Sequence, residues 1–210
     1  MPDNRNLAAG RVITGFSHPV VARYNAPGGP GTYTEGRVAA RGVSMDLDVT
    51  TADNNDFFAD NSVAESEAGI FADGALALVL DGMHPGVERF VFGLEEPREV
   101  DVNGQKIKLS GTGTSANPPY VGVGVIIEYK SNGHNIYVPV YFTKGKFRQT
   151  GMSAQTRQGS INWQTQAVTV DLHRDDTADH HWKEVGEDCA TEAEAIAILD
   201  AVLNVEEAEA

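Results

Sequence analysis

The sequence predicts a mainly β (α+β) protein: two packed antiparallel sheets, as a β-sandwich or barrel, with one short flanking helix and a C-terminal amphipathic helix. Its 210 residues include 22 glycines and nine prolines, a density typical of a chain with many turns. Several runs alternate apolar and polar residues at period two, and only two segments have helical spacing. The length suits one well-buried domain.

The predicted strands are separated by segments rich in glycine, asparagine or proline. They cover residues 10–24, 35–49, 70–81, the two halves of 99–109, 120–130, 134–147 and 159–174. Asn103-Gly104 predicts a type I′ hairpin turn, because both central positions of that turn need positive φ. Residues 131–133 predict a second tight hairpin.

In the last predicted strand, the apolar residues expected to face the core switch from odd-numbered to even-numbered positions. Ile161 and Trp163 are expected inward at its start, and Val168 and Val170 further on. Such a change of parity predicts a bulge or corner near Gln164–Gln166.

Two helices are predicted. The first covers 83–94, with Pro85 in its first turn and Gly93 as the C-cap. The second begins after Thr191, which stands at capping-box spacing from Glu194. Its apolar stripe is expected from three residues at helical spacing, namely Ile196, Leu199 and Leu203.

The composition restricts the class of function. A net charge of −14 and a pI of about 4.7 disfavour tight coating of DNA, although they suit a channel through which DNA slides. The single cysteine, Cys189, excludes an internal disulfide and a cysteine zinc cluster. No apolar run is long enough for a membrane span, so we expect a soluble protein with no membrane partner, made in the cytoplasm.

Metal and catalytic patterns are weak. Read as a calcium loop from Asp53, the sequence puts Phe57 where a ligand is needed and Phe58 where glycine is needed. The adjacent His180 and His181 have no metal-ligand spacing, so a solvated loop is expected before Trp182. No catalytic motif is present. We therefore expect no cofactor, no catalytic or metal-binding residue, and no enzymatic activity.

Charge is unevenly distributed near the C-terminus. Twelve acidic residues and one lysine follow Arg174. From Tyr137 up to and including Arg174, basic residues dominate: Lys144, Lys146, Arg148, Arg157 and Arg174. Both regions could be solvated faces. Alternatively, an acidic loop on one copy meets a basic strand on another, and such head-to-tail contacts propagate into rings or filaments.

One ordered set of short motifs resembles a known family. The set runs through Asn55, Phe57 to Asn61, Glu65, Gly74, Leu76 and Leu78, and resumes at Gly122 to Gly124, Lys144, Phe147, Thr156, Gly159, Ser160 and Trp163 to Thr165. In order and spacing these residues resemble the phi13-like major tail proteins, or tail tube proteins, of long-tailed phages. The resemblance covers residues 10–185.

The resemblance implies a structural virion protein. Its subunits would form stacked hexameric rings around a tape-measure protein, with tail terminator and tail-tip proteins as further partners. DNA would pass through the lumen transiently on ejection. The chain would be made in the host bacterial cytoplasm and end in the phage tail. The alternative is a monomeric β-sandwich module of a virion that binds a receptor or carbohydrate.

The resemblance also implies a domain plan. A tail-tube β-sandwich domain would cover 1–185, with a loop near 50–69 projecting toward the next ring. The C-terminal helix and acidic tail, residues 186–210, are expected from the sequence pattern alone, because the part of the chain after Trp182 has no counterpart in that family. We expect Phe57 and Phe58 to anchor the subunit interface; alternatively, one of them fills the subunit's own core. The full set of expected interface residues is Asp56, Phe57, Phe58, Asp60, Asn61, Lys144, Lys146, Arg148 and Arg157.

Overall fold

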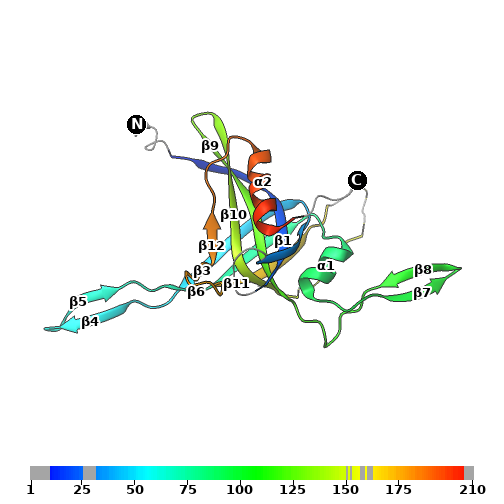
Figure 1. Cartoon of the computed structure of the whole chain (residues 1–210), viewed down its shortest axis with the longest axis horizontal. Coiled ribbons are helices and arrows are strands. Elements are labelled where there is room, and N and C mark those ends of the chain that lie inside the picture. Colours follow the sequence, from blue (N-terminus) through cyan, green and yellow to red (C-terminus); the bar gives the residue numbers. More distant parts are fainter. Residues whose placement is uncertain are drawn as a thin grey trace.

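The computed structural model describes residues 10–25, 32–149, 151, 153–156, 159 and 163–205. They form one large antiparallel sheet, two separate two-stranded hairpins and two helices (Figure 1). The predicted mainly β, antiparallel fold with two helices is therefore confirmed. The elements of the large sheet are β1 (Val12–Tyr24), β2 (Tyr33–Val38), β3 (Gly42–Thr51), β6 (Phe71–Leu80), β9 (Tyr120–Ser131), β10 (His134–Phe147), β11 (Gln166–His173) and β12 (Lys183–Val185).

The large sheet curls until its edge strand β3 comes into contact with β1, the neighbour of the other edge strand. Its strand order is β2-β1-β9-β10-β11-β6-β3, with β12 added to β10. Strands β2 and β3 are the two edges, yet only residues 39–41 separate them, a span of at most about 14 Å. The Ala39 N–H donates to the Pro19 carbonyl of β1 at 2.8 Å, and the Asp81 N–H after β6 donates to the Arg41 carbonyl at 3.0 Å. The expected single strand at 35–49 is thus two strands, because the chain crosses from one edge to the other.

Curling encloses the main apolar core between the two halves of the sheet. Its side chains alternate along each strand, as period two requires. The central members, all buried, are Leu76, Leu78, Leu80, Val121, Val123, Val125, Val138, Phe142, Val168, Val170 and Leu172. Helix α1 (Pro85–Phe92) closes one end of this core with Val87, Phe90 and Val91. Its C-cap is Gly93 in the left-handed conformation, at φ 58°, as predicted.

Helix α2 (Glu192–Leu203) packs on the outer face of β1, β9 and β10, where it covers a second apolar cluster. The predicted capping box between Thr191 and Glu194 is present. Leu199 and Leu203 are fully buried, as predicted, and Ala195 completes the buried stripe. Thus the C-terminal helix belongs to the same packed body as the sheet.

Two glycines make room for α2. Gly122 and Gly124 of β9 point outward, between the inward-facing valines. A Cβ on Gly124 would lie 2.7 Å from Cδ1 of Leu203 and 2.8 Å from Cγ2 of Val20. The Val-Gly alternation of β9 therefore serves two layers, with valines in the core and glycines beneath the helix.

The predicted start of the last long strand is wrong. Strand β11 begins at Gln166, whose register partner is Leu80, the last residue of β6. The Trp163 side chain is 83% exposed because β6 offers no partner beyond that point, and Ile161 lies outside the described residues.

Neither described helix is long and apolar enough to cross a membrane.

Candidate self-association surfaces

The first candidate surface is a hairpin that extends far from the sheet (Figure 1). It consists of β4 (Asn55–Ala59) and β5 (Ser62–Glu67), and we name it the acidic arm. The turn residues Asp60 and Asn61 have φ values of 50° and 62°, which aspartate and asparagine tolerate better than most residues. Both were expected at an interface; the structure shows that they form the turn.

Two phenylalanines are exposed on the acidic arm. The Phe57 and Phe58 side chains are each 64% exposed, so the alternative that one fills the subunit's own core is wrong. Phe57 stands opposite Glu65 and Phe58 opposite Val63, with a bulge between the two pairs. Residues directly opposite share a face of a hairpin. Phe58 and Val63 therefore form an apolar pair on one face, and Phe57 lies on the other.

Hydrogen bonds tie the acidic arm to the body and stiffen it. At its base the Ala52 N–H donates to the Ile70 carbonyl at 2.8 Å, and the Gly69 N–H donates to Oδ1 of Asn54 at 3.1 Å. Within the arm, the Ser66 hydroxyl donates to the Asp56 carboxylate. The expected interface residue Asp56 thus also has a partner in its own chain.

The second candidate surface is the hairpin of β7 (Arg98–Val102) and β8 (Gln105–Leu109), which we name the lysine arm. Its turn has the predicted positive φ at Asn103 and Gly104, 55° and 79°. The register places four apolar residues on one face, namely Val100, Val102, Ile107 and Leu109, and four charged residues on the other, namely Glu99, Asp101, Lys106 and Lys108. The lysine arm is amphipathic although it covers no core.

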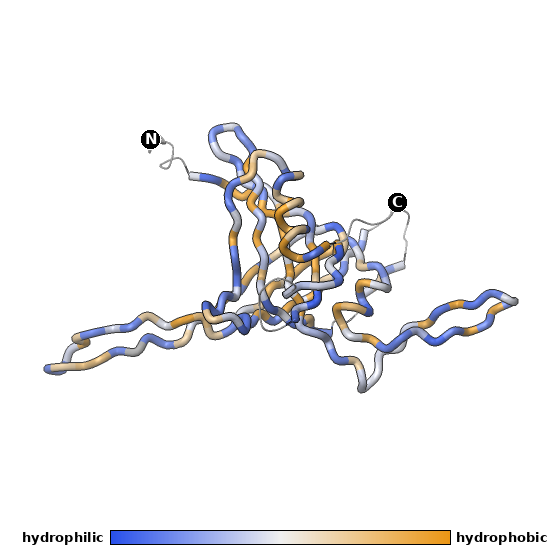
Figure 2. The backbone as a smooth tube through the Cα atoms, in the orientation of Figure 1, coloured by the Kyte–Doolittle hydropathy of each residue, from blue (hydrophilic) through white to orange (hydrophobic). Residues whose placement is uncertain are grey.

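The two arms leave the body in opposite directions (Figure 1). Figure 2 shows hydrophobic and hydrophilic residues alternating along them, whereas the hydrophobic residues of the body gather at its centre. Val102, Ile107 and Leu109 of the lysine arm are between 43% and 48% exposed. Both arms therefore expose apolar side chains to solvent, on opposite sides of the body.

The basic residues expected at the interface have partners in their own chain. The Nζ atom of Lys144 lies 2.7 Å from Asp176, and the Lys144 side chain is 14% exposed. Arg148 pairs with Asp171 at 2.5 Å. Lys146 donates to the Asn117 side chain at 3.3 Å. Arg157 lies outside the described residues, and an interface role for this basic set stays a prediction.

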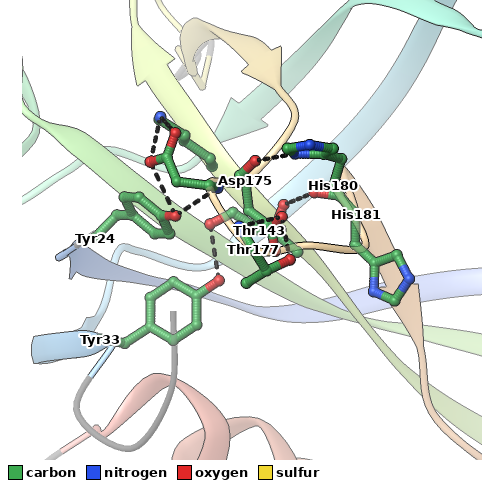
Figure 3. A network of polar contacts seen from close by, with 9 residues as sticks. Tyr24, Tyr33, Thr143, Asp175, Thr177, His180 and His181 are labelled. Carbon is green, nitrogen blue, oxygen red and sulfur yellow. Dashed lines mark hydrogen bonds and ion pairs between the residues drawn. The ribbon is translucent and has the colours of Figure 1, made fainter. Parts of the chain in front are cut away.

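The segment 174–182 is a loop whose side chains are mostly exposed, as expected, including those of His180 and His181. Part of it is nevertheless fixed to the sheet. The Asp175 side chain is buried and accepts from the Thr177 hydroxyl at 2.6 Å. The Thr143 hydroxyl donates to the His181 carbonyl at 2.6 Å, and the Tyr33 hydroxyl to the Thr143 carbonyl at 2.8 Å, as Figure 3 shows. Burial raises the pKa of Tyr33 well above its ordinary value. This network holds the segment in place.

The ring of Trp182 completes that attachment. It stacks on Phe71 with 4.6 Å between ring centroids and 9° between ring planes. Because Phe71 begins β6 and Trp182 precedes β12, the stack joins two segments that are distant in sequence. No signal in the sequence near Trp182 indicates its partner.

A third surface is the bare outer face of β3 and β6. The register places Asp46 opposite Ala77, and Asp48 opposite Ala75. These side chains point away from the core, because Leu47 and Leu76 between them point inward. Asp73 lies on the same face, and all three aspartates are exposed. On the adjacent strand β11, Asp171 stands opposite Ala75 and is paired with Arg148.

The described residues offer little for catalysis. Among them, no three histidine, cysteine, aspartate or glutamate side chains are grouped to hold a metal ion. Burial first, and then the nearby acids Glu194, Asp188 and Glu187, raise the pKa of the Cys189 thiol, which disfavours the reactive thiolate. A cavity of about 520 Å³ beside α1 has Glu88 as the one ionisable group among its described lining residues.

Comparison with models of protein families gives no match, and comparison with curated proteins gives none either.

Proposed function

We propose that this chain is a structural subunit that assembles with copies of itself into stacked hexameric rings, the tail tube of a long-tailed phage through which DNA is ejected. One observation carries the proposal: two hairpins with exposed apolar side chains project in opposite directions from a curled β body. A lone two-stranded hairpin is marginally stable in water. Both arms would gain order and buried apolar area from a neighbouring subunit.

The acidic arm supplies the anchors. Burying one phenylalanine ring gains about 1.5–3 kcal/mol, and Phe57 and Phe58 are each 64% exposed in the single chain. Four carboxylates lie along the same hairpin, on Asp56, Asp60, Glu65 and Glu67. These charges would keep the exposed phenylalanine side chains of the free subunit from associating with unrelated surfaces.

The arrangement of the arms favours propagating contacts. They lie at opposite ends of the body and differ in sequence, so a contact made by one arm need not be repeated by symmetry at the other. Contacts between unlike surfaces generate closed rings or open stacks, which are the two geometries a tube requires.

The outer face of β3 and β6 is our candidate for the lumen. Asp46, Asp48 and Asp73 would present carboxylates that repel the phosphates of passing DNA. The neighbouring cation Arg148 is paired with Asp171. Helix α2 covers the outer face of the other half of the sheet. The tape-measure, terminator and tip proteins follow from the resemblance and are part of the same proposal.

The test is electron microscopy of the purified chain in negative stain, together with sedimentation velocity. We expect rings or tubes from the wild type, and loss of them in Phe57→Ala and Phe58→Ser. The matched control is Ile13→Ser, because Ile13 is 63% exposed on the body, outside both arms. If both phenylalanine variants form tubes at the wild-type yield, the Phe57 and Phe58 side chains are not the anchors.

A monomeric binding module is the second candidate function. It is favoured by the cavity beside α1 together with the Trp163 ring, which is 83% exposed only two residues from the cavity-lining Thr165. An exposed aromatic ring close in sequence to a cavity that has hydroxyl and amide side chains in its lining suits a carbohydrate ligand. Dispersed monomers at every salt concentration, with Trp163 fluorescence that responds to oligosaccharides, would favour this candidate over the tube.

A further inference from the structure

Each arm has an open hydrogen-bonding edge along both of its strands. In the described part of the chain, β4 and β5 pair only with each other, and so do β7 and β8. Unpaired N–H and C=O groups on a strand edge are ready to add another strand. The arms are the described strands that stand furthest from the body (Figure 1).

Charge distinguishes the four strands. Strand β5 carries Glu65 and Glu67 two residues apart, and β8 carries Lys106 and Lys108 at the same spacing. Because side chains alternate along a strand, each pair projects from one face. Lys106 has one exposed partner in its own arm, Glu99 at 3.1 Å.

The two faces of each arm also match. On the acidic arm, Glu65 shares a face with Phe57, and the opposite face carries the Phe58–Val63 pair. On the lysine arm, the two lysines lie opposite the face that carries Ile107 and Leu109. Side-by-side pairing of β5 with β8 would therefore continue the charged face and the apolar face together.

Other pairings of the same strands are less favourable. Pairing β5 with β7 would bring its glutamates against Glu99 and Asp101, and pairing β5 with a second β5 would bring glutamate against glutamate. A pair of β8 strands would bring lysine against lysine. Like charges directly opposite one another destabilise a strand pair.

We infer that β5 of one copy adds to β8 of a second copy, so that the two arms form one four-stranded intermolecular sheet. This inference rests on the proposed self-assembly and names the surface that receives the acidic arm. The partner is a second copy of this chain, and the contact joins opposite ends of the two subunits. The Phe58–Val63 pair and the apolar residues of the lysine arm then share one face, and Phe57 lies on the charged face.

Charge reversal with rescue tests the pairing. We expect Lys106→Glu with Lys108→Glu, and separately Glu65→Lys with Glu67→Lys, to raise the concentration needed for assembly about tenfold or more. An equimolar mixture of the two variants restores attraction at every contact when the two variants alternate, and a chain with all four changes restores it at every contact without mixing. Both should assemble near the wild-type concentration.

The matched control is Lys130→Glu. Lys130 is also an exposed strand lysine, but β1 and β10 occupy both edges of its strand β9. This variant should assemble like the wild type. Raising the salt concentration should weaken wild-type assembly, because the proposed charge pairs are exposed.

Cross-linking identifies the strands directly. In a Cys189→Ser background, one population carries Val63→Cys and another carries Ile107→Cys, and a short bifunctional thiol reagent is added to the mixture. We expect mixed dimers in excess over dimers of either single population. Dimers formed mainly within one population, or no cross-linking in samples that contain rings or tubes, would overturn the β5–β8 contact.

The proposed strand pairing and the proposed self-assembly can be refuted separately. If the wild type assembles and the lysine reversals assemble equally well, the strand pairing is wrong while the tube subunit stands. If the wild type stays monomeric at all protein and salt concentrations, the self-assembly and the strand pairing are both wrong.

Discussion

Lys144 and Asp176 form an ion pair within one chain, with Nζ 2.7 Å from Oδ2. The pair joins the acidic segment after Arg174 to the basic end of β10. Lys144 also lies over the rings of Tyr24 and Tyr120, at 5.3 and 4.7 Å. Hence this lysine is held by its own subunit, and its loss should affect folding before assembly.

Asp176→Asn should lower stability in a pH-dependent way. The Lys144 ammonium, as hydrogen-bond partner, holds the pKa of Asp176 below its ordinary 3.8. A lowered folded-state pKa stabilises the fold above pH 3.8, and this contribution is lost as the pH falls through the folded-state value. We expect a loss of at most about 1 kcal/mol at pH 7, because Asp176 is partly solvated. Urea unfolding at pH 7 and pH 3 measures it.

The matched control is Asp46→Asn, on the exposed face of β3. It should leave the unfolding free energy nearly unchanged at pH 7. An equal loss from Asp176→Asn at both pH values would contradict the ion-pair explanation.

Trp182→Ala should destabilise the body strongly. It removes the stack on Phe71 and a contact with the buried ring of Phe142, and large-to-small changes of this kind cost about 2–4 kcal/mol. Trp163→Ala is the control, since its ring is 83% exposed, and should change stability by less than about 0.5 kcal/mol. Equal effects of the two changes in chemical denaturation would argue against the Phe71 stack.

Gly124→Ala should weaken the packing of α2 on the sheet. The new methyl group would meet Val20, Leu199 and Leu203 at 2.7 to 3.2 Å, and overpacking of this kind costs about 1–3 kcal/mol. Gly111→Ala is the control, because a Cβ added at Gly111 would meet nothing within 4 Å. Hydrogen exchange should show faster exchange of α2 amides in the first variant only; unchanged protection would mean that the helix adjusts freely.

Replacing residues 55–67 with a short Gly-Ser linker should leave the body folded. None of the described side chains in that hairpin belongs to either apolar cluster. We expect the unfolding free energy to change by less than about 0.5 kcal/mol, while assembly is lost. A large loss of stability in thermal unfolding would show that the arm supports the body.

Local signals in the sequence predict local structure well here. Asn103-Gly104 forms the predicted turn, Thr191 with Glu194 forms the predicted cap, and Leu76 points inward as its alternation requires. Each of these depends on residues a few positions apart, so the sequence contains the whole cause.

Other features depend on distant partners and could not be predicted. Trp163 is exposed because β6 ends at Leu80, and Asp175 is buried because segment 174–182 packs on strands far away in sequence. The acidic arm is an intermediate case. Its adjacent phenylalanines break the alternation that predicts a strand, although Asp60-Asn61 suits the turn that the structure shows.

The difference between the two arms gives an assembled filament a direction. Every subunit added in the proposed way leaves an acidic arm open at one end of the stack and a lysine arm open at the other, so the ends grow by different contacts. A subunit that lacks the lysine arm could still join through its acidic arm, but nothing could then be added to it. At a small molar fraction such a subunit would act as a chain terminator and shorten the tubes.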